Sequence, residues 1–169
     1  MQILTNDHRH QGLALEDIPA PSIDAEAPRA LLARCPAHGP TPLVRADTLE
    51  AQLGGAQLWV KDERGRMGLG SFKALGAAYV IAHQAMTAGG DPATALAGRT
   101  YVTASAGNHG MSVAAGARVF GAEAVIYLAE TVPEGFAERL RAKGAQVVRA
   151  GAEYEASMAA AARAADDNG

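Results

Sequence analysis

The sequence has 169 residues, of which 49% are hydrophobic and 20% charged, and its net charge is −3. These values are typical of a globular domain that is long enough to bury a core. The lysines and arginines are scattered, so they form no basic face for a nucleic-acid partner. No apolar run approaches the ~20 residues that span a bilayer, and we expect no membrane partner.

The amino-terminal region indicates the cellular compartment of the protein. Its first residues, MQILTNDHRHQG, lack the apolar run of a secretory signal. Cys35 is the single cysteine, so an internal disulfide is impossible, which fits a reducing compartment. We therefore expect a cytoplasmic protein. Residues 1–40 are rich in Pro, Asp and Ala and predict an irregular segment with a short helix near 26–34.

From residue 57 onward the apolar residues become periodic, and strands alternate with helices. The expected strands cover 57–63, 99–104, 123–129 and 145–150. The expected helices cover 72–87, 108–120, the stretch between Thr131 and Gly144, and 153–167. Such alternation predicts an α/β fold, a parallel sheet with flanking helices and right-handed crossovers.

Local signals predict how two of these helices begin. Ser71 is the expected cap of the helix over 72–87. The segment TVPE, residues 131–134, predicts a capping box with a proline at the start of the helix. Within the first expected strand, Trp59 is expected to lie in the core.

Two turns that follow expected strands hold unusual residues. GLGSFKALG, residues 68–76, places Lys73 among small and apolar residues, although lysine is almost never fully buried without a partner. TASAGNHG, residues 103–110, leads directly into a helix. Free N–H groups and the helix dipole make such a turn suitable for a carboxylate or phosphate. In parallel α/β sheets, ligands bind in turns of this kind.

Other kinds of site find no support in the residues. The sequence has no GxxxxGK[ST] and no GxGxxG after a strand, which argues against a P-loop and a dinucleotide site. HExxH is absent and the histidines are dispersed, so we expect no metal. A binding module for a different anion stays open as an alternative.

The two turns resemble those of the fold-type II pyridoxal-phosphate enzymes, the tryptophan synthase β-like family. The resemblance runs from Thr41-Pro42-Leu43 through SFK at 71–73 and SAGNHG at 105–110 to residue 169. SFK followed by SAGNHG, each at a strand-to-helix turn, makes the resemblance specific. Within the family, ERGRMGLGSFKALGAAYV, residues 63–80, is most similar to the diaminopropionate ammonia-lyases.

The resemblance implies roles for individual residues. Lys73 would bind pyridoxal 5′-phosphate covalently through its amine and would then act as a general base on the substrate Cα–H. Phe72 would pack against the cofactor, and Asn108 would hydrogen-bond the 3′-oxygen of its ring. The substrate carboxylate would be held by the loop residues Ser105, Ala106, Gly107, Asn108 and His109.

The implied activity is a β-elimination in amino-acid catabolism. The ammonia-lyase reaction on a small amino acid such as 2,3-diaminopropionate would give pyruvate and ammonia. Diaminopropionate ammonia-lyases tend to carry an aspartate where this chain has Ala106, and the SAGNH form is more similar to the dehydratases. A lyase of the serine or threonine dehydratase type is therefore an alternative.

The resemblance also bears on domain organisation, because family members are longer than this chain. We expect residues 41–169 to be the N-terminal α/β region of a pyridoxal-phosphate enzyme, truncated before the loop that holds the cofactor phosphate. The full-length form is expected to be a homo-oligomer. The isolated chain is expected to be inactive, and a catalytically incomplete fragment is the third alternative.

Overall fold

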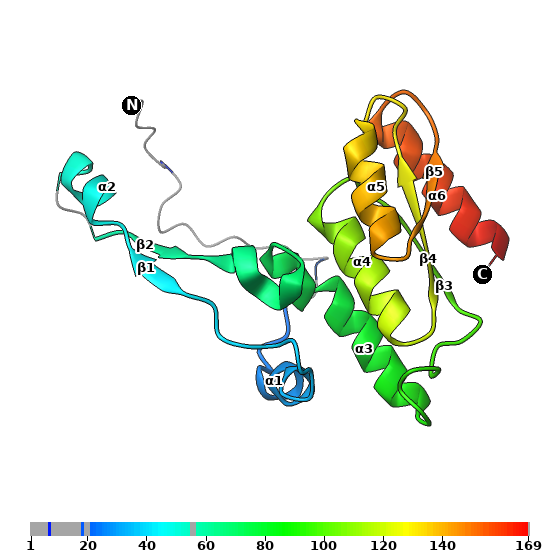
Figure 1. Ribbon diagram of the computed structural model, residues 1–169, viewed down its shortest axis with the longest axis horizontal. Helices are drawn as coiled ribbons and strands as arrows, with labels where there is room; N and C mark the ends of the chain where they lie inside the picture. Colours follow the sequence, from blue (N-terminus) through cyan, green and yellow to red (C-terminus); the bar gives the residue numbers. More distant parts are fainter. Residues whose placement is uncertain (1–6, 8–17, 19–20, 55–56, 169) are drawn as a thin grey trace.

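The computed structural model describes residues 7, 18, 21–54 and 57–168. A two-stranded hairpin precedes a larger layered α/β part (Figure 1). The described elements are, in chain order, α1 (Glu26–Leu32), β1 (Leu43–Arg45), α2 (Asp47–Gln52), β2 (Trp59–Lys61), the 3-10 helices η1 (Glu63–Gly68) and η2 (Phe72–Leu75), α3 (Ala77–Ala88), β3 (Thr100–Ala104), α4 (Asn108–Val119), β4 (Glu123–Leu128), α5 (Glu134–Ala142), β5 (Gln146–Arg149) and α6 (Tyr154–Asn168).

The larger part is built on three parallel strands in the order β3-β4-β5. Along β4, Ala124, Ile126 and Leu128 are buried, whereas the residues between them are half-buried. This alternation directs one face of the sheet into the core. The parallel sheet with flanking helices confirms the fold class predicted from the sequence.

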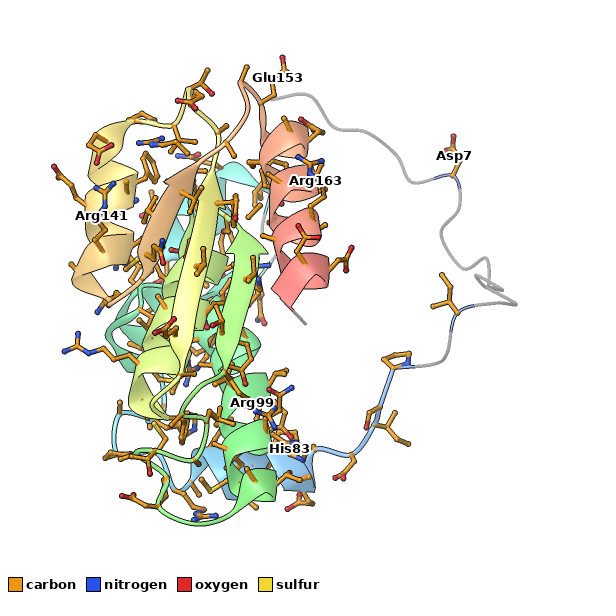
Figure 2. The ribbon with its side chains drawn as sticks, turned by 90° about the vertical axis from the view of Figure 1, so that its right-hand side faces the viewer. Asp7, His83, Arg99, Arg141, Glu153 and Arg163 are labelled. Carbon is orange, nitrogen blue, oxygen red and sulfur yellow. The ribbon has the colours of Figure 1, made fainter. Side chains whose placement is uncertain are left out.

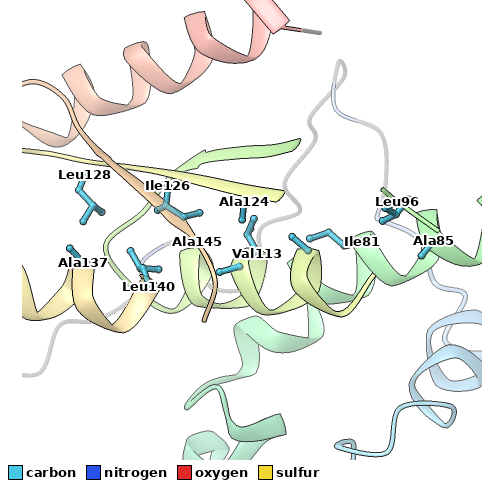
Figure 3. Packing of buried hydrophobic residues seen from close by; sticks show 12 residues of the cluster. Ile81, Ala85, Leu96, Val113, Ala124, Ile126, Leu128, Ala137, Leu140 and Ala145 are labelled. Atoms are coloured by element: carbon cyan, nitrogen blue, oxygen red, sulfur yellow. The ribbon is translucent and has the colours of Figure 1, made fainter. Parts of the chain in front are cut away.

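Helices cover both faces of this sheet. On the core face, α4 and α5 pack against the strands, and α3 packs on α4. Figure 3 shows Ile126 and Leu128 of β4 facing Ala137 and Leu140 of α5. Helix α6 packs on β3 and β4, and it lies on the opposite side of the sheet from α5 (Figures 1 and 2).

The first expected strand does not belong to this sheet. It is shortened to β2, which pairs antiparallel with β1 in a separate two-stranded sheet. Trp59 is 52% exposed, so its expected place in the core is wrong. A short apolar run predicts a strand but not its partner. Neither β1 nor α2 was expected, because three to six residues are too few to show a period.

Two helix beginnings also differ from expectation. The helix predicted over 72–87 is divided at Gly76 into η2 and α3. The capping box at 131–134 is wrong, because α5 has no side-chain cap. The Thr131 hydroxyl donates instead to the carbonyl of Ala152 at 3.1 Å. The Glu134 carboxylate pairs with arginine side chains, so tertiary partners outcompete the local pattern.

The amino-terminal prediction is tested only in part. Helix α1 lies where a short helix near 26–34 was expected. Most of residues 1–20 lies outside the described residues, so the irregular course expected there stays a prediction. Among the helices that are described, none is both long and apolar enough to cross a membrane.

Candidate functional site

The lysine segment forms the short helix η2. Ser71, in extended conformation, precedes it, and its hydroxyl accepts a hydrogen bond from the N–H of Lys73 at 3.3 Å. This confirms Ser71 as a helix cap. Phe72 is 61% exposed, and Lys73 is also exposed. Both side chains therefore project from the segment rather than into the core.

The Lys73 amine has one aromatic neighbour. Its Nζ lies 5.7 Å from the centroid of the Phe72 ring, within the range of a cation–π contact. No acidic side chain in the described ranges forms an ion pair with Lys73. The amine is thus open to a ligand, in contrast to Lys61, whose Nζ donates to the carbonyl of Thr41 at 2.5 Å.

The second turn joins β3 to α4 and is closed by Ser105. The Ser105 hydroxyl accepts hydrogen bonds from the N–H groups of Gly107 at 3.3 Å and Gly110 at 3.2 Å. A Cβ added at Gly110 would lie 2.6 Å from the carbonyl oxygen of Ser105. Glycine is required at position 110 for this close approach.

The residues between these two glycines face open space. Asn108 and His109 are exposed, and neither their N–H groups nor the Asn108 side chain has a hydrogen-bond partner among the described residues. A Cβ at Gly107 would meet nothing within 4 Å. Because α4 starts here, its unpaired N–H groups and dipole favour an anion in this space.

The fold brings these two turns together through Ser112. Helix η2 packs against α4. The buried Ser112 hydroxyl of α4 donates to the carbonyl of Lys73 at 3.0 Å and accepts from the N–H of Ala78 at 3.2 Å. The backbone of the lysine segment is therefore fixed to the helix whose first turn holds Asn108. No sequence signal pointed to Ser112, since a single serine in an apolar helix has no pattern.

The charged residues before the lysine segment are held by arginines. The Glu63 carboxylate accepts hydrogen bonds from Arg66 and Thr41. These bonds, that from Arg66 above all, lower the pKa of Glu63 to about 2. Asp62 caps η1, and Arg64 lowers the pKa of its carboxyl to about 2. Arg66 is itself 7% exposed and also donates to the carbonyl of Gly39. The Glu-x-x-Arg spacing was the available signal for this pair, and sequence reasoning missed it.

Part of a pyridoxal-phosphate site fits these residues. An accessible amine, an aromatic ring beside it, a free carboxamide and unpaired N–H donors are the groups expected to hold the cofactor and a substrate carboxylate. Two cavities, of about 950 and 390 Å³, are lined by none of the seven expected site residues. The candidate site is therefore separate from these two cavities. No cluster suited to a metal ion occurs in the part of the chain that is described.

The chain is similar to known pyridoxal-phosphate enzymes in sequence. The family model described as pyridoxal-phosphate dependent enzyme matches residues 35–169. Diaminopropionate ammonia-lyase of Escherichia coli strain K12 is 37% identical over 111 residues, which are 60% of this chain and 27% of that protein. The biosynthetic L-threonine dehydratase of Burkholderia multivorans is 38% identical over 102 residues, which are 59% of this chain and 18% of that protein.

A solved structure agrees with these matches. The crystal structure of holo diaminopropionate ammonia lyase from Escherichia coli superposes with a TM-score of 0.74 and 27% sequence identity. The superposition covers 83% of this chain and 39% of that one. The chain thus spans less than half the length of each of these relatives.

Proposed function

Because the chain belongs to the pyridoxal-phosphate dependent enzyme family, we propose that it binds pyridoxal 5′-phosphate at Lys73 and contributes to a β-eliminating ammonia-lyase. The observation that carries the proposal is the hydrogen bond from Ser112 to the carbonyl of Lys73. This bond holds the backbone of Lys73, which carries the accessible amine, against the helix that begins with unpaired donors.

Each residue of the candidate site has a specific role in the proposed reaction. Lys73 holds the cofactor covalently and, once its amine is released, takes the proton from the substrate Cα. When bound, the cofactor supplies an electron sink for the carbanion at Cα. Phe72 packs against its ring, and the Asn108 carboxamide hydrogen-bonds the ring oxygen. Donors of the loop from Ser105 to His109 hold and orient the substrate carboxylate.

The preferred substrate is a small amino acid with an amine on Cβ, such as 2,3-diaminopropionate, which with one water molecule gives pyruvate and two molecules of ammonia. The match to diaminopropionate ammonia-lyase over 60% of the chain supports this choice. A dehydratase of serine or threonine is the second candidate. It is favoured by Ala106, which stands where the first group tends to carry an acid, and by the match to L-threonine dehydratase.

Activity belongs to a longer polypeptide in this proposal. The chain matches 27% of one relative and 39% of the solved enzyme, so residues 41–169 supply the lysine and the carboxylate loop but not the whole pocket. We accordingly expect little turnover from this chain alone. The homo-oligomeric state and the cytoplasmic location expected from the sequence stay predictions.

Covalent trapping tests cofactor binding directly. The purified chain is incubated with pyridoxal 5′-phosphate, reduced with borohydride, and digested for peptide mapping of its three lysines, Lys61, Lys73 and Lys143. Formaldehyde under the same reduction reports how accessible each amine is without recognition. We expect the cofactor to label Lys73 saturably and in preference to Lys61 and Lys143. Formaldehyde should label the three lysines without this preference. Equal preference with both aldehydes would overturn the proposal.

A further inference from the structure

We propose that Ser112 is the positioning residue of Lys73, and that its hydroxyl sets where the amine lies relative to the first turn of α4. The inference rests on the proposed function, because it concerns the same amine. Ser112 itself does not touch the ligand in this arrangement. It acts through the backbone of the lysine segment.

A break at Gly76 separates η2 from α3. Gly76 has φ −98° and ψ −86°, which is outside helical geometry, so the helix does not run through this residue. A continuous helix would bond the N–H of Ala78 to a carbonyl one turn earlier. At the break, that N–H donates instead to the Ser112 hydroxyl, and the same hydroxyl donates to the carbonyl of Lys73. One hydroxyl therefore bridges both sides of the break.

The surroundings hold this hydroxyl in place. Ser112 is 0% exposed, so water does not replace its bonds. One turn further along α4, a Cβ at Gly116 would lie 3.2 Å from Cα of Ala78 and 3.1 Å from Cδ1 of Ile81. Helices α3 and α4 are thus in close contact beside Ser112, which keeps the N–H of Ala78 within reach.

The same helix carries both halves of the candidate site. Asn108 and Ser112 are four residues apart in α4 and lie on one side of it. Lys73 has a long exposed side chain, and the position of its backbone sets the space that its amine can reach. The Ser112 bond therefore fixes the lysine backbone relative to the donors at Asn108 and His109.

The chain offers a matched control for removing this hydroxyl. Ser157 in α6 is 1% exposed, and its hydroxyl donates to the carbonyl of Tyr154 at 2.7 Å. Ser112→Ala and Ser157→Ala each delete one buried hydroxyl, but only the first one touches the lysine segment. Ser112→Cys keeps a group of similar size that donates and accepts weakly.

The first measurement is cofactor trapping at Lys73. We expect Ser112→Ala to raise the pyridoxal 5′-phosphate concentration for half-maximal labelling about five- to tenfold, because the N–H of Ala78 loses this bond and the carbonyl of Lys73 keeps only the N–H of Gly76. Ser157→Ala should match the unsubstituted chain, and Ser112→Cys should recover part of the loss. Formaldehyde labelling should stay unchanged throughout. If Ser112→Ala labels normally, or if Ser157→Ala is equally impaired, the inference is overturned.

The second measurement needs no cofactor and separates this inference from the proposed function. Amide hydrogen exchange is followed in peptides that cover residues 72–80 and 154–160. Ser112→Ala should speed exchange in the first peptide and Ser157→Ala in the second. Unchanged exchange over 72–80 would refute the positioning role. If the unsubstituted chain shows no preferential trapping at Lys73, the proposed function is refuted instead, whatever the exchange data show.

Discussion

The N–H of Gly110 donates a hydrogen bond to the side-chain hydroxyl of Ser105 at 3.2 Å, so the turn before α4 closes on its own first residue. This bond uses a donor that a helix start would otherwise leave free. Among the described residues, the N–H groups of Asn108 and His109, between the two bonded glycines, are then the donors left without a partner. Ser105 therefore shapes the candidate carboxylate site by capping the helix.

Replacing Gly110 tests how closely this turn is packed. In Gly110→Ala the added Cβ would lie 2.6 Å from the Ser105 carbonyl oxygen, which is backbone and has little room to move. We expect the free energy of unfolding to fall by about 1–3 kcal/mol in urea titrations. Gly135→Ala in α5 is the control, because nothing lies within 4 Å of its Cβ. There the change should be neutral or stabilising, by up to ~1 kcal/mol.

Asn108 offers a test of recognition without a change in stability. Its side chain is exposed and has no partner among the described residues, so Asn108→Ala should leave the thermal midpoint of the apo chain unchanged within a degree or two. Losing one hydrogen bond to the cofactor ring should weaken trapping at Lys73 by about three- to tenfold. A variant that traps the cofactor normally would remove Asn108 from the proposed site.

The carboxylates of Asp62 and Glu63, at the start of η1, predict how stability depends on pH. The pKa of Glu63 is lowered from 4.5 to about 2 by Arg66 and Thr41, and that of Asp62 from 3.8 to about 2 by Arg64. A lowered pKa in the folded state means that the unfolded chain binds protons first as the pH falls. The stabilisation is therefore complete above pH 4.5 and is lost as the pH falls towards 2.

Thermal unfolding between pH 2 and 7 measures this loss. We expect the midpoint to fall with pH below about 4.5, and Glu63→Gln to lower the midpoint at pH 7 while flattening the acid slope. Glu153, which is labelled in Figure 2, lies in the exposed loop before α6. The variant Glu153→Gln therefore controls for the loss of one negative charge. If both variants keep the original slope, Glu63 does not carry this part of the acid sensitivity.

The sequence predicted the parallel sheet well because its strands are apolar runs between glycines. Both turns of the candidate site were located by their residues, SFK and SAGNHG. The helix break at Gly76 was missed because the apolar spacing continues across it. Ser112 was missed for a different reason: its importance comes from a partner distant in the sequence, the Lys73 carbonyl. Contacts of that kind leave no local pattern.

Leu140 links the core of α5 to the same turn. It is 0% exposed, and its Cδ2 would lie 3.1 Å from a Cβ at Gly110. Leu140→Ala should lower the free energy of unfolding by about 2–5 kcal/mol, through lost burial and the cavity that remains. Leu43→Ala is the matched control, because Leu43 is 60% exposed and its truncation should cost little.

Combining Leu140→Ala with Gly110→Ala separates the two close contacts of the new methyl group. The smaller side chain at 140 relieves the contact with Cδ2, but the contact with the Ser105 carbonyl oxygen, the shorter one at 2.6 Å, persists. Because backbone yields less readily than a side chain, we expect the two costs to add within about 0.5 kcal/mol in urea titrations. If the double variant loses at least 1 kcal/mol less unfolding free energy than the sum of the two single losses, the contact with Leu140, and not the turn, is what requires glycine at 110.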